Sequence, residues 1–423
     1  MKTLFKLNKN LFTLILVMVI NSSCNTRIRH DHHDNIILTG LDVLVENDFS
    51  QIGGKRVGLI TNQTGVDKVL TQNIDLFNAS DVIKLEAIFT PEHGLFGTVP
   101  AGKNVIEKNK NLDVPVYSLY GKNKKPNKRM LKNIDILVYD IQDIGVRSYT
   151  YISTMGLAME AAAENKIDFM VLDRPNPIGL DKIEGSILEL SYKSYIGMYP
   201  IPYVYGLTSG ELAKMINQSG WLGNKKCNLK IIKMKNFDRK MIGNIVFDNW
   251  IPTSPHVPHS TTPAYLVATG IIGELGVFSI GVGYTLPFKT IAAPWIDSKL
   301  IAEKMNARDL PGVMFRPIEY TPYYSIYKGE LVKGIQIYIT NIEVVDLILI
   351  QFHFLEIHNE LYPDKNPFEL AKNVNLDMFD KAIGTDKIRK KFMEAFLVSD
   401  IKSKMINDAY DFKTFKEEFH LYD

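Results

Sequence analysis

Five short apolar runs, each ending in polar residues, limit the folds open to this chain more than any other feature. Runs that are apolar throughout, rather than at alternate positions, are typical of strands buried on both faces of a sheet. Helical spacing appears between them, most clearly over residues 153–165, which hold four alanines. This alternation predicts an α/β fold with a Rossmann-like, doubly wound parallel sheet. The five runs span residues 55–60, 85–89, 114–120, 134–139 and 168–172.

A different pattern begins near residue 265. A capped helix is expected at 297–307, an alternating strand at 334–340, and amphipathic helices at 387–397 and 401–419. Together these elements predict a second, smaller α+β domain. Because 423 residues exceed one typical domain, two domains are the natural expectation. We predict a Rossmann-like catalytic domain over residues 36–265 and a C-terminal auxiliary domain over residues 266–423.

The first 23 residues are typical of an export signal. Three lysines precede an apolar stretch over residues 11–20, which is too short to span a bilayer. The sequence Asn-Ser-Ser then leads to Cys24, and small residues before a cysteine are typical of bacterial lipoprotein signals. We therefore predict a signal peptide over residues 1–23, lipid on the Cys24 thiol and a lipidated tether over residues 24–35. The mature protein would be anchored in the cell envelope, periplasmic or surface-facing; an ordinary signal peptide is the alternative.

The composition argues against several classes of partner. With 49 basic and 47 acidic residues, the chain has no basic excess of the kind that nucleic-acid binding requires. Cys227 is the only cysteine besides Cys24, so no internal disulfide framework is expected. No glycine-rich nucleotide motif follows the first apolar run, and no metal-ligand spacing appears. We therefore predict no cofactor and no metal.

Polar residues gather where the predicted strands end. Ligands of open parallel sheets bind outside the carboxyl ends of the strands, so these residues are candidates for a functional cleft. A site rich in carboxylates suits acid/base chemistry on a neutral sugar better than phosphate binding. Tyrosines at 149, 151, 195, 199, 203 and 205 could stack on sugar rings, although core packing is equally expected for each. The strand-end residues are Asn62, Glu92, His93, Asp140, Gln142, Asp143, Asp173, Arg174 and Asn176.

Several segments together resemble the exo-β-N-acetylmuramidase family of peptidoglycan-recycling enzymes. The resemblance runs from about residue 40 to near the C-terminus. It implies a Rossmann-like domain, a smaller C-terminal domain and a cleft between them. It also implies release of terminal N-acetylmuramic acid from the non-reducing end of peptidoglycan fragments. The segments are Gly-Leu-Ile-Thr-Asn at 58–62, Pro-Glu-His-Gly at 91–94, Tyr-Ser-Leu-Tyr-Gly at 117–121, Asp-Ile-Gln-Asp-Ile-Gly at 140–145, Asp-Arg-Pro-Asn-Pro at 173–177 and Ala-Pro-Trp-Ile-Asp at 293–297.

One stretch departs from the family pattern. Ile280, Val282 and Leu286 stand where the best-known members carry a glutamate and two arginines, while Glu274 remains just upstream. The departure leaves the exact sugar open. It also leaves open a second reading, in which the chain is a non-catalytic, sugar-binding envelope lipoprotein of the same fold.

From position, residue type and resemblance, we predict roles for individual residues. Glu92 is the predicted proton donor, and His93 would orient its carboxyl group or adjust its pKa. Asp143 or Asp140 would supply the second carboxylate, unless the acetamido group of the substrate takes that part. Arg147 or Arg174 would bind the lactyl carboxylate. Further predicted substrate contacts are Asn62, Gln142, Tyr149, Tyr151, Asp173, Asn176 and Glu274.

Overall fold

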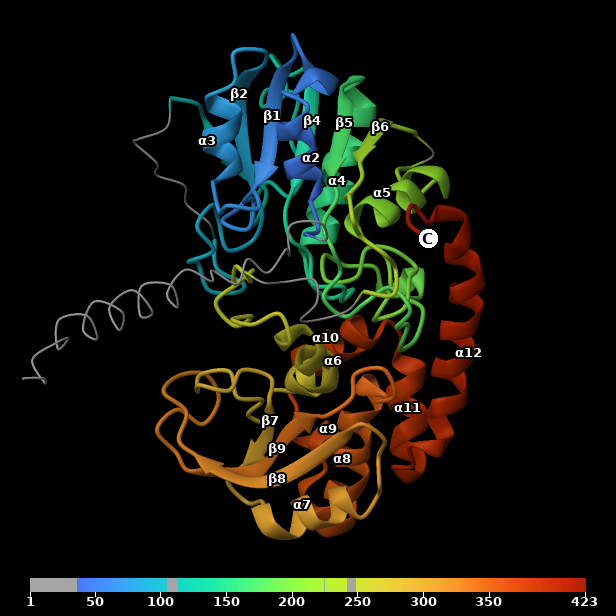
Figure 1. Cartoon of the computed structure of the whole chain (residues 1–423). Coiled ribbons are helices and arrows are strands. Elements are labelled where there is room, and N and C mark those ends of the chain that lie inside the picture. Colours follow the sequence, from blue (N-terminus) through green and yellow to red (C-terminus); the bar gives the residue numbers. More distant parts are fainter. Residues whose placement is uncertain (1–35, 105–112, 224, 242–248) are drawn as a thin grey trace, which may run out of the picture. The chain divides into compact units, whose positions relative to one another are not determined.

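The computed structural model describes residues 36–104, 113–223, 225–241 and 249–423, and its larger sheet is entirely parallel (Figure 1). The six strands run in the order β3-β2-β1-β4-β5-β6, the order of doubly wound dinucleotide-binding folds, with a switch point between β1 and β4. The predicted fold class is confirmed. The strands are β1 (Arg56–Thr61), β2 (Lys84–Thr90), β3 (Val116–Ser118), β4 (Ile136–Asp140), β5 (Asp168–Leu172) and β6 (Asn228–Ile232).

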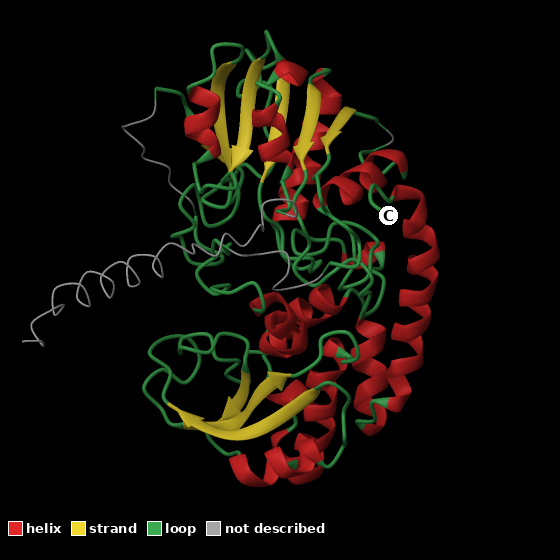
Figure 2. Ribbon diagram, in the orientation of Figure 1, coloured by secondary structure: helices red, strands yellow, loops and turns green. Residues whose placement is uncertain are grey.

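Both faces of this sheet are covered by helices, which explains the unbroken apolar runs (Figure 2). In β4, Ile136 and Val138 pack into one buried cluster, while Leu137 and Tyr139 pack into another on the opposite face. Residues that alternate between two cores must all be apolar. The first cluster includes residues of α2 (Gly40–Glu46) and α3 (Asn73–Asn78), and the second includes residues of α4 (Tyr151–Asn165) and α5 (Ser209–Gln218).

The C-terminal region is built around a three-stranded antiparallel sheet in the order β7-β9-β8. The side chains on one face of this sheet pack into a large buried core together with α6, α7, α8 and the helices that follow. The predicted α+β character is therefore confirmed. The strands are β7 (Thr290–Ala293), β8 (Val313–Tyr320) and β9 (Val332–Ile339); the helices are α6 (Thr262–Gly273), α7 (Ser298–Asn306), α8 (Leu347–Leu361), α9 (Pro367–Leu370), α10 (Asn373–Ile383), α11 (Asp386–Ala395) and α12 (Ser399–Lys416).

Short 3-10 turns complete the described structure, at η1 (Ser50–Ile52), η2 (Leu190–Tyr192), η4 (Pro363–Lys365) and η5 (Glu417–Phe419). The predicted boundary between residues 265 and 266 falls inside α6 and stays a prediction. None of the described helices is long and apolar enough to cross a membrane. Cys24 and the predicted tether lie outside the described residues.

The end of the chain returns to the parallel sheet. The Tyr422 hydroxyl donates a hydrogen bond to Asp173 Oδ2 at 2.6 Å, and the Leu421 amide donates one to Glu211 Oε1 at 2.9 Å. The buried ammonium of Lys416 donates to the carbonyls of Leu180 and Gly206. Helix α12 therefore fastens the C-terminal region to loops at the carboxyl edge of the sheet.

Candidate active site

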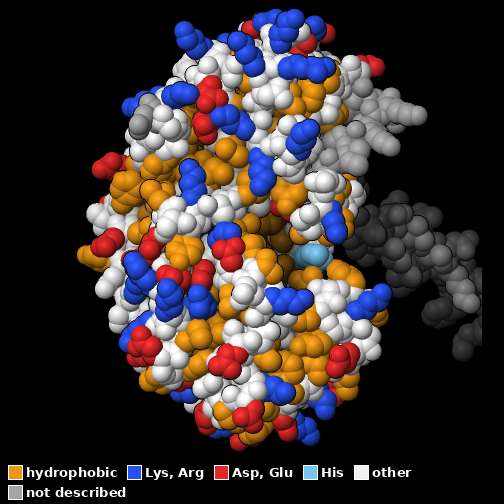
Figure 3. All heavy atoms as spheres, turned by 180° about the vertical axis from the view of Figure 1, so that it is seen from behind, with side chains coloured by type: hydrophobic (Ala, Val, Ile, Leu, Met, Phe, Trp, Pro, Cys, Tyr) orange, Lys and Arg blue, Asp and Glu red, His pale blue; other side chains and the backbone are white. Residues whose placement is uncertain are grey.

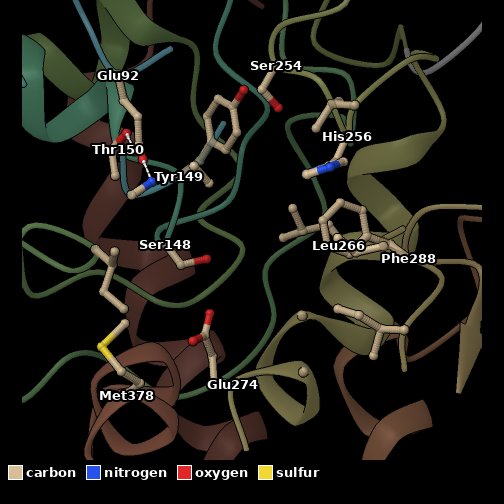
Figure 4. A pocket seen from close by; sticks show the side chains of 18 of the residues that line it. Glu92, Ser148, Tyr149, Thr150, Ser254, His256, Leu266, Glu274, Phe288 and Met378 are labelled. Atoms are coloured by element: carbon tan, nitrogen blue, oxygen red, sulfur yellow. Dashed lines mark hydrogen bonds between the residues drawn. The ribbon is translucent and has the colours of Figure 1, made fainter. Parts of the chain in front are cut away.

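A cavity of about 630 Å³ lies between loops at the carboxyl edge of the parallel sheet and the segment from α6 to Phe288 (Figure 4). The view from behind shows it as a hollow with a histidine at its mouth (Figure 3). Its size is typical of small-ligand sites. The polar and charged side chains that line it are Glu92, His93, Tyr120, Lys124, Ser148, Tyr149, Thr150, Ser194, Tyr195, Tyr203, Ser254, His256, Glu274, Ser325 and Lys381.

Glu92 reaches the cavity from the loop that follows β2. The backbone turns sharply there, because His93 and Gly94 both have positive φ, at 73° and 77°. A non-glycine residue in this conformation is uncommon, and such conformations cluster at functional sites. The turn leaves Glu92 nearly buried, at 7% exposure, on the cavity wall.

Hydrogen bonds from neighbouring residues hold the Glu92 carboxylate. The Gly102 amide donates to Oε1 at 2.9 Å, and the Thr150 hydroxyl donates to Oε2 at 2.8 Å. Thr150 precedes α4 but does not cap it with its side chain, so its hydroxyl is left for Glu92. Donors of this kind stabilise the charged form of a carboxylate. Burial and the neighbouring charge of Glu92 raise the pKa of Tyr120 to about 12, so its phenol stays protonated.

Glu274 enters the same cavity from the other side. It follows α6 directly, and Figure 4 shows its carboxylate pointing into the hollow toward Ser148. Burial raises its pKa, and no described residue is found to donate a hydrogen bond to the carboxylate. The carboxyl end of a helix also disfavours negative charge. The two glutamates of the cavity thus differ in their hydrogen-bond partners.

Two histidines lie at the cavity with different partners. His93 Nδ1 lies 2.7 Å from the Val99 carbonyl, which can only accept, so Nδ1 carries the proton and Nε2 remains for a ligand. His256 Nε2 lies 2.6 Å from the Tyr324 hydroxyl. Burial lowers the pKa of His256, and nearby His93 lowers it further. His256 therefore contributes a mostly neutral ring to the cavity wall.

The remaining wall consists of apolar side chains, serine and tyrosine hydroxyls, and two lysines. Ile280 and Val282, two of the positions that depart from the family pattern, line it together with Leu266 and Phe288. Lys381 is paired with Asp377 at 2.5 Å. Lys124 lies over the ring of Tyr195, with Nζ 4.5 Å from the ring centre, and forms no ion pair within the described part of the chain.

Both arginines predicted to bind the lactyl carboxylate are held by protein groups away from the cavity lining. Arg147 is fully buried, and its guanidinium donates to the carbonyls of Ser186, Ile201 and Ala382. Arg174 forms an ion pair with Asp140, at 2.6 Å from Nε to Oδ1. The contacts that the structure shows for these two arginines are structural, and sugar binding by either one stays a prediction.

The predicted second carboxylates also lie behind the wall. Asp140 accepts from Arg174 and, at 2.7 Å, from Asn73. Asp143 Oδ2 accepts from the Tyr205 hydroxyl and, at 2.8 Å, from the Gly145 amide, while its Oδ1 has no hydrogen-bond donor among the described residues. Burial raises the pKa of Asp143 to about 6. Neither carboxylate lines the cavity, so a direct catalytic role for them is not supported by their position.

The other residues predicted to contact the substrate form hydrogen bonds within the protein that hold loops in place. Asp173 accepts from Gly210, Thr208 and Tyr422, and burial raises its pKa to about 6. The Asn62, Gln142 and Asn176 side chains each bind backbone groups or Thr64 close by, and the Tyr151 hydroxyl donates to the Thr253 carbonyl. Of the predicted site residues, the cavity brings together Glu92, His93, Tyr149 and Glu274.

Several lining residues were not assigned a role from the sequence. Thr150 lies between Tyr149 and Tyr151, which were predicted to contact the substrate. Tyr195 belongs to the group of tyrosines that the sequence analysis noted. His256, Ser254 and Lys124 carry no local signal, because only the folded chain brings their loops to the cavity. No cluster of three or more metal-binding side chains occurs among the described residues. Cys227 is buried, and burial raises its thiol pKa to about 12, which suits a packing role.

Comparison with known proteins agrees with the family resemblance seen in the sequence. Residues 57–261 match the family model for the N-terminal part of the exo-β-N-acetylmuramidase NamZ, and residues 265–422 match the model for its C-terminal part. The chain belongs to the NamZ family. It is 40% identical over 387 residues to the peptidoglycan β-N-acetylmuramidase NamZ of Bacillus subtilis, covering 91% of each chain. The glycoside hydrolase class predicted from the sequence is that of the NamZ family.

Two solved structures of DUF1343 family proteins from Bacteroides fragilis share the fold. One is 46% identical, with a TM-score of 0.88, and the match covers 92% of this chain and all of that one. The other is 27% identical, with a TM-score of 0.72, and the match covers 92% and 99% of the two chains. The NamZ architecture is thus shared along nearly the whole chain.

The buried carboxyl group of Asp143 predicts an unusual pH dependence of stability. Its folded pKa of about 6 exceeds the ordinary 3.8, so the folded state binds more protons than the unfolded state between these values. Its contribution is therefore favourable below about pH 4 and is lost as pH rises to 6, by up to about 3 kcal/mol. Asp143→Asn should remove this loss. Urea unfolding should show the variant gaining stability relative to wild type between pH 4 and pH 7.5.

Asp135→Asn is the matched control. Arg56 lowers the pKa of Asp135 to about 2, so the contribution of this carboxylate to stability increases with pH instead of decreasing. That variant should lose stability relative to wild type as pH rises through 2 to 4. If Asp143→Asn instead unfolds more readily at pH 7.5, the buried-acid account is wrong. If it folds normally but loses turnover by orders of magnitude, the catalytic prediction for Asp143 stands.

Proposed function

We propose that this protein is an exo-acting glycoside hydrolase that releases terminal N-acetylmuramic acid from the non-reducing end of peptidoglycan fragments. The B. subtilis relative named above acts as a peptidoglycan β-N-acetylmuramidase, and the match covers both parts of the chain that form the cavity. The observation that carries the proposal is the pair Glu92 and Glu274, which face one cavity from opposite sides.

Glycoside hydrolysis needs one protonated acid and one group that stabilises the positive charge developing on the sugar. Two carboxyl groups in unlike environments can divide these tasks. The Glu92 carboxylate accepts hydrogen bonds from Gly102 and Thr150, whereas the Glu274 carboxylate accepts none from the described residues and burial raises its pKa. These contacts support Glu274 as the proton donor and Glu92 as the charged partner. The sequence-based assignment of the donor to Glu92 is the competing prediction.

Exchange of each glutamate for glutamine separates the two assignments. Glu274→Gln should lower kcat on a muropeptide-derived disaccharide by at least ~10²-fold, the scale of general acid catalysis. Its loss should be smaller on an aryl muramide, because an activated leaving group needs less protonation. Glu92→Gln should lose comparable activity on both substrates. Steady-state kinetics of the three proteins on both substrates provide the measurement.

The reverse pattern, with Glu92→Gln rescued by the aryl leaving group, would return the proton donor to Glu92. Near-wild-type turnover of the disaccharide by both variants would exclude this cavity as the active site. Complete inactivity of the wild-type protein on all muramides, with tight sugar binding, would favour the non-catalytic alternative.

We propose that Lys124 provides the positive charge for the lactyl carboxylate, which distinguishes muramic acid from glucosamine. The other lining lysine, Lys381, is already paired with Asp377, and neither Arg147 nor Arg174 lines the cavity. Lys124→Met should lower kcat/KM for an aryl N-acetylmuramide about tenfold, the equivalent of about 1.4 kcal/mol. The aryl N-acetylglucosaminide lacks the carboxylate, so its kcat/KM should change little.

Lys122→Met is the control, because Lys122 is exposed in the same loop without lining the cavity. Equal losses on both sugars would rule out a role in selectivity.

We propose that the protein is a lipoprotein of the cell envelope, anchored through Cys24 after removal of residues 1–23. The support is the signal-like sequence alone, with three lysines, an apolar stretch and small residues before the cysteine. Cys24→Ala should move the protein from the detergent phase to the aqueous phase on Triton X-114 partitioning of cells that express it. A variant that stays in the detergent phase would contradict the anchor.

A further inference from the structure

We infer that a stack of tyrosines beside the cavity forms a second binding site, which holds sugar rings of the glycan chain beyond the residue being released. The stack consists of Tyr320, Tyr284 and Tyr323. This inference rests on the proposed function, because it concerns the part of the substrate that leaves the cavity.

The three rings form a graded series from core to solvent. Tyr284 stacks on Tyr320 with ring centres 4.5 Å apart and on Tyr323 with centres 6.2 Å apart, at interplanar angles of 22° and 28°. Tyr320 is 4% exposed, whereas Tyr323 is 69% exposed. The stack thus presents a large aromatic surface to solvent from a buried base.

Hydrogen bonds hold this stack in place. The Tyr320 hydroxyl lies 2.8 Å from both Thr290 Oγ1 and Ser279 Oγ, and the Tyr323 amide donates to the Gly283 carbonyl at 2.7 Å. Gly283 has φ of 93°, and a Cβ there would meet the Tyr324 carbonyl oxygen at 2.1 Å. The two loops therefore pack backbone to backbone, and the exposed ring is positioned before any ligand arrives. Such preorganisation reduces the entropy lost on binding.

The same two loops also line the cavity. Val282 lies on the cavity wall and precedes Tyr284 by two residues; Ser325 lies on the wall and follows Tyr323 by two. Between them, Tyr324 stacks on His256 of the cavity at 6.0 Å and an angle of 29°. The loop that carries the exposed Tyr323 is therefore in contact with the cavity wall through Tyr324 and Ser325.

This arrangement fits a polysaccharide better than an unspecified apolar partner. An exo-acting enzyme encloses the terminal sugar, and the rest of the chain must leave through the mouth of the cavity. Pyranose rings have apolar faces and hydroxyl edges, which match the apolar face and polar tip of tyrosine. Exposed apolar surface next to a cavity is a common feature of ligand-binding sites.

The dependence of kinetics on chain length tests the inference. The wild-type protein should have a lower KM for long, peptide-free glycan strands that begin with N-acetylmuramic acid than for the disaccharide. Tyr323→Ala should raise the KM for the long strands 3- to 10-fold and leave kcat/KM on an aryl muramide within twofold. Because Tyr323 is mostly exposed, the thermal transition should be unchanged.

Tyr410→Ala is the matched control. Tyr410 is 72% exposed on α12, which lies across the C-terminal region from these loops in Figure 1. That variant should keep the wild-type KM on every substrate. Equal KM values of the wild type for short and long strands, or equal effects of the two tyrosine variants, would overturn the inference.

The inference and the proposed function fail in different ways. A wild-type protein without muramidase turnover would contradict the function alone. Affinity electrophoresis in gels that contain glycan strands would still compare the two variants in that case. Retardation of Tyr323→Ala equal to that of wild type would then overturn the second site.

Discussion

A buried ion pair at the carboxyl edge of the parallel sheet holds together the loops on which the site is built. Asp140 ends β4, and Arg174 follows β5. Asn73 donates to Asp140, and Arg174 also donates to the Val66 carbonyl, so the segment after β1 joins the same network. Removing one partner of such a pair typically costs about 3–5 kcal/mol, because the other charge stays buried and unpaired. The strand-end charges thus fix three loops around the switch point of the sheet, and the cavity forms above them.

The sequence was informative wherever local pattern determines structure. The unbroken apolar runs predicted the five strands β1 to β5 to within two residues. Four of them lie inside the sheet, where a strand buried on both faces must be apolar at nearly every position. Strand β6 was missed because Asn228 and Lys230 interrupt its apolar residues, as its partly exposed position at the edge of the sheet permits. The helix over 153–165 begins two residues earlier than predicted, at Tyr151. Glu92 was found because a parallel sheet presents its ligands at the carboxyl ends of its strands.

Other parts of the site depend on contacts that no local pattern records. The Arg147 guanidinium, one of two predicted to bind the lactyl carboxylate, donates to the Ala382 carbonyl, which lies 235 residues further along the chain, and sugar binding by it stays a prediction. Asp143 shares its strand end with Asp140, yet both side chains turn toward protein partners behind the cavity wall. Glu274 was among the predicted substrate contacts, but its place opposite Glu92 and the presence of His256 in the cavity follow only from the packing of the C-terminal region against the sheet. Sequence pattern identified the correct edge of the sheet, but it could not tell which polar residues there face the cavity.

Polar residues line both sides of the cavity, and the C-terminal region adds an apolar patch beside Glu274. Glu92, Thr150 and Tyr120 come from loops of the parallel sheet, whereas Ile280, Val282 and Phe288 come from the C-terminal region. Such a combination suits an amino sugar, whose ring has both hydroxyl edges and apolar faces. A crystal structure of the protein soaked with N-acetylmuramic acid tests this account most directly. The account predicts the sugar in this cavity, with oxygen atoms within hydrogen-bonding distance of Glu92 and Glu274. Sugar bound elsewhere on the protein, with neither glutamate in contact, would contradict it.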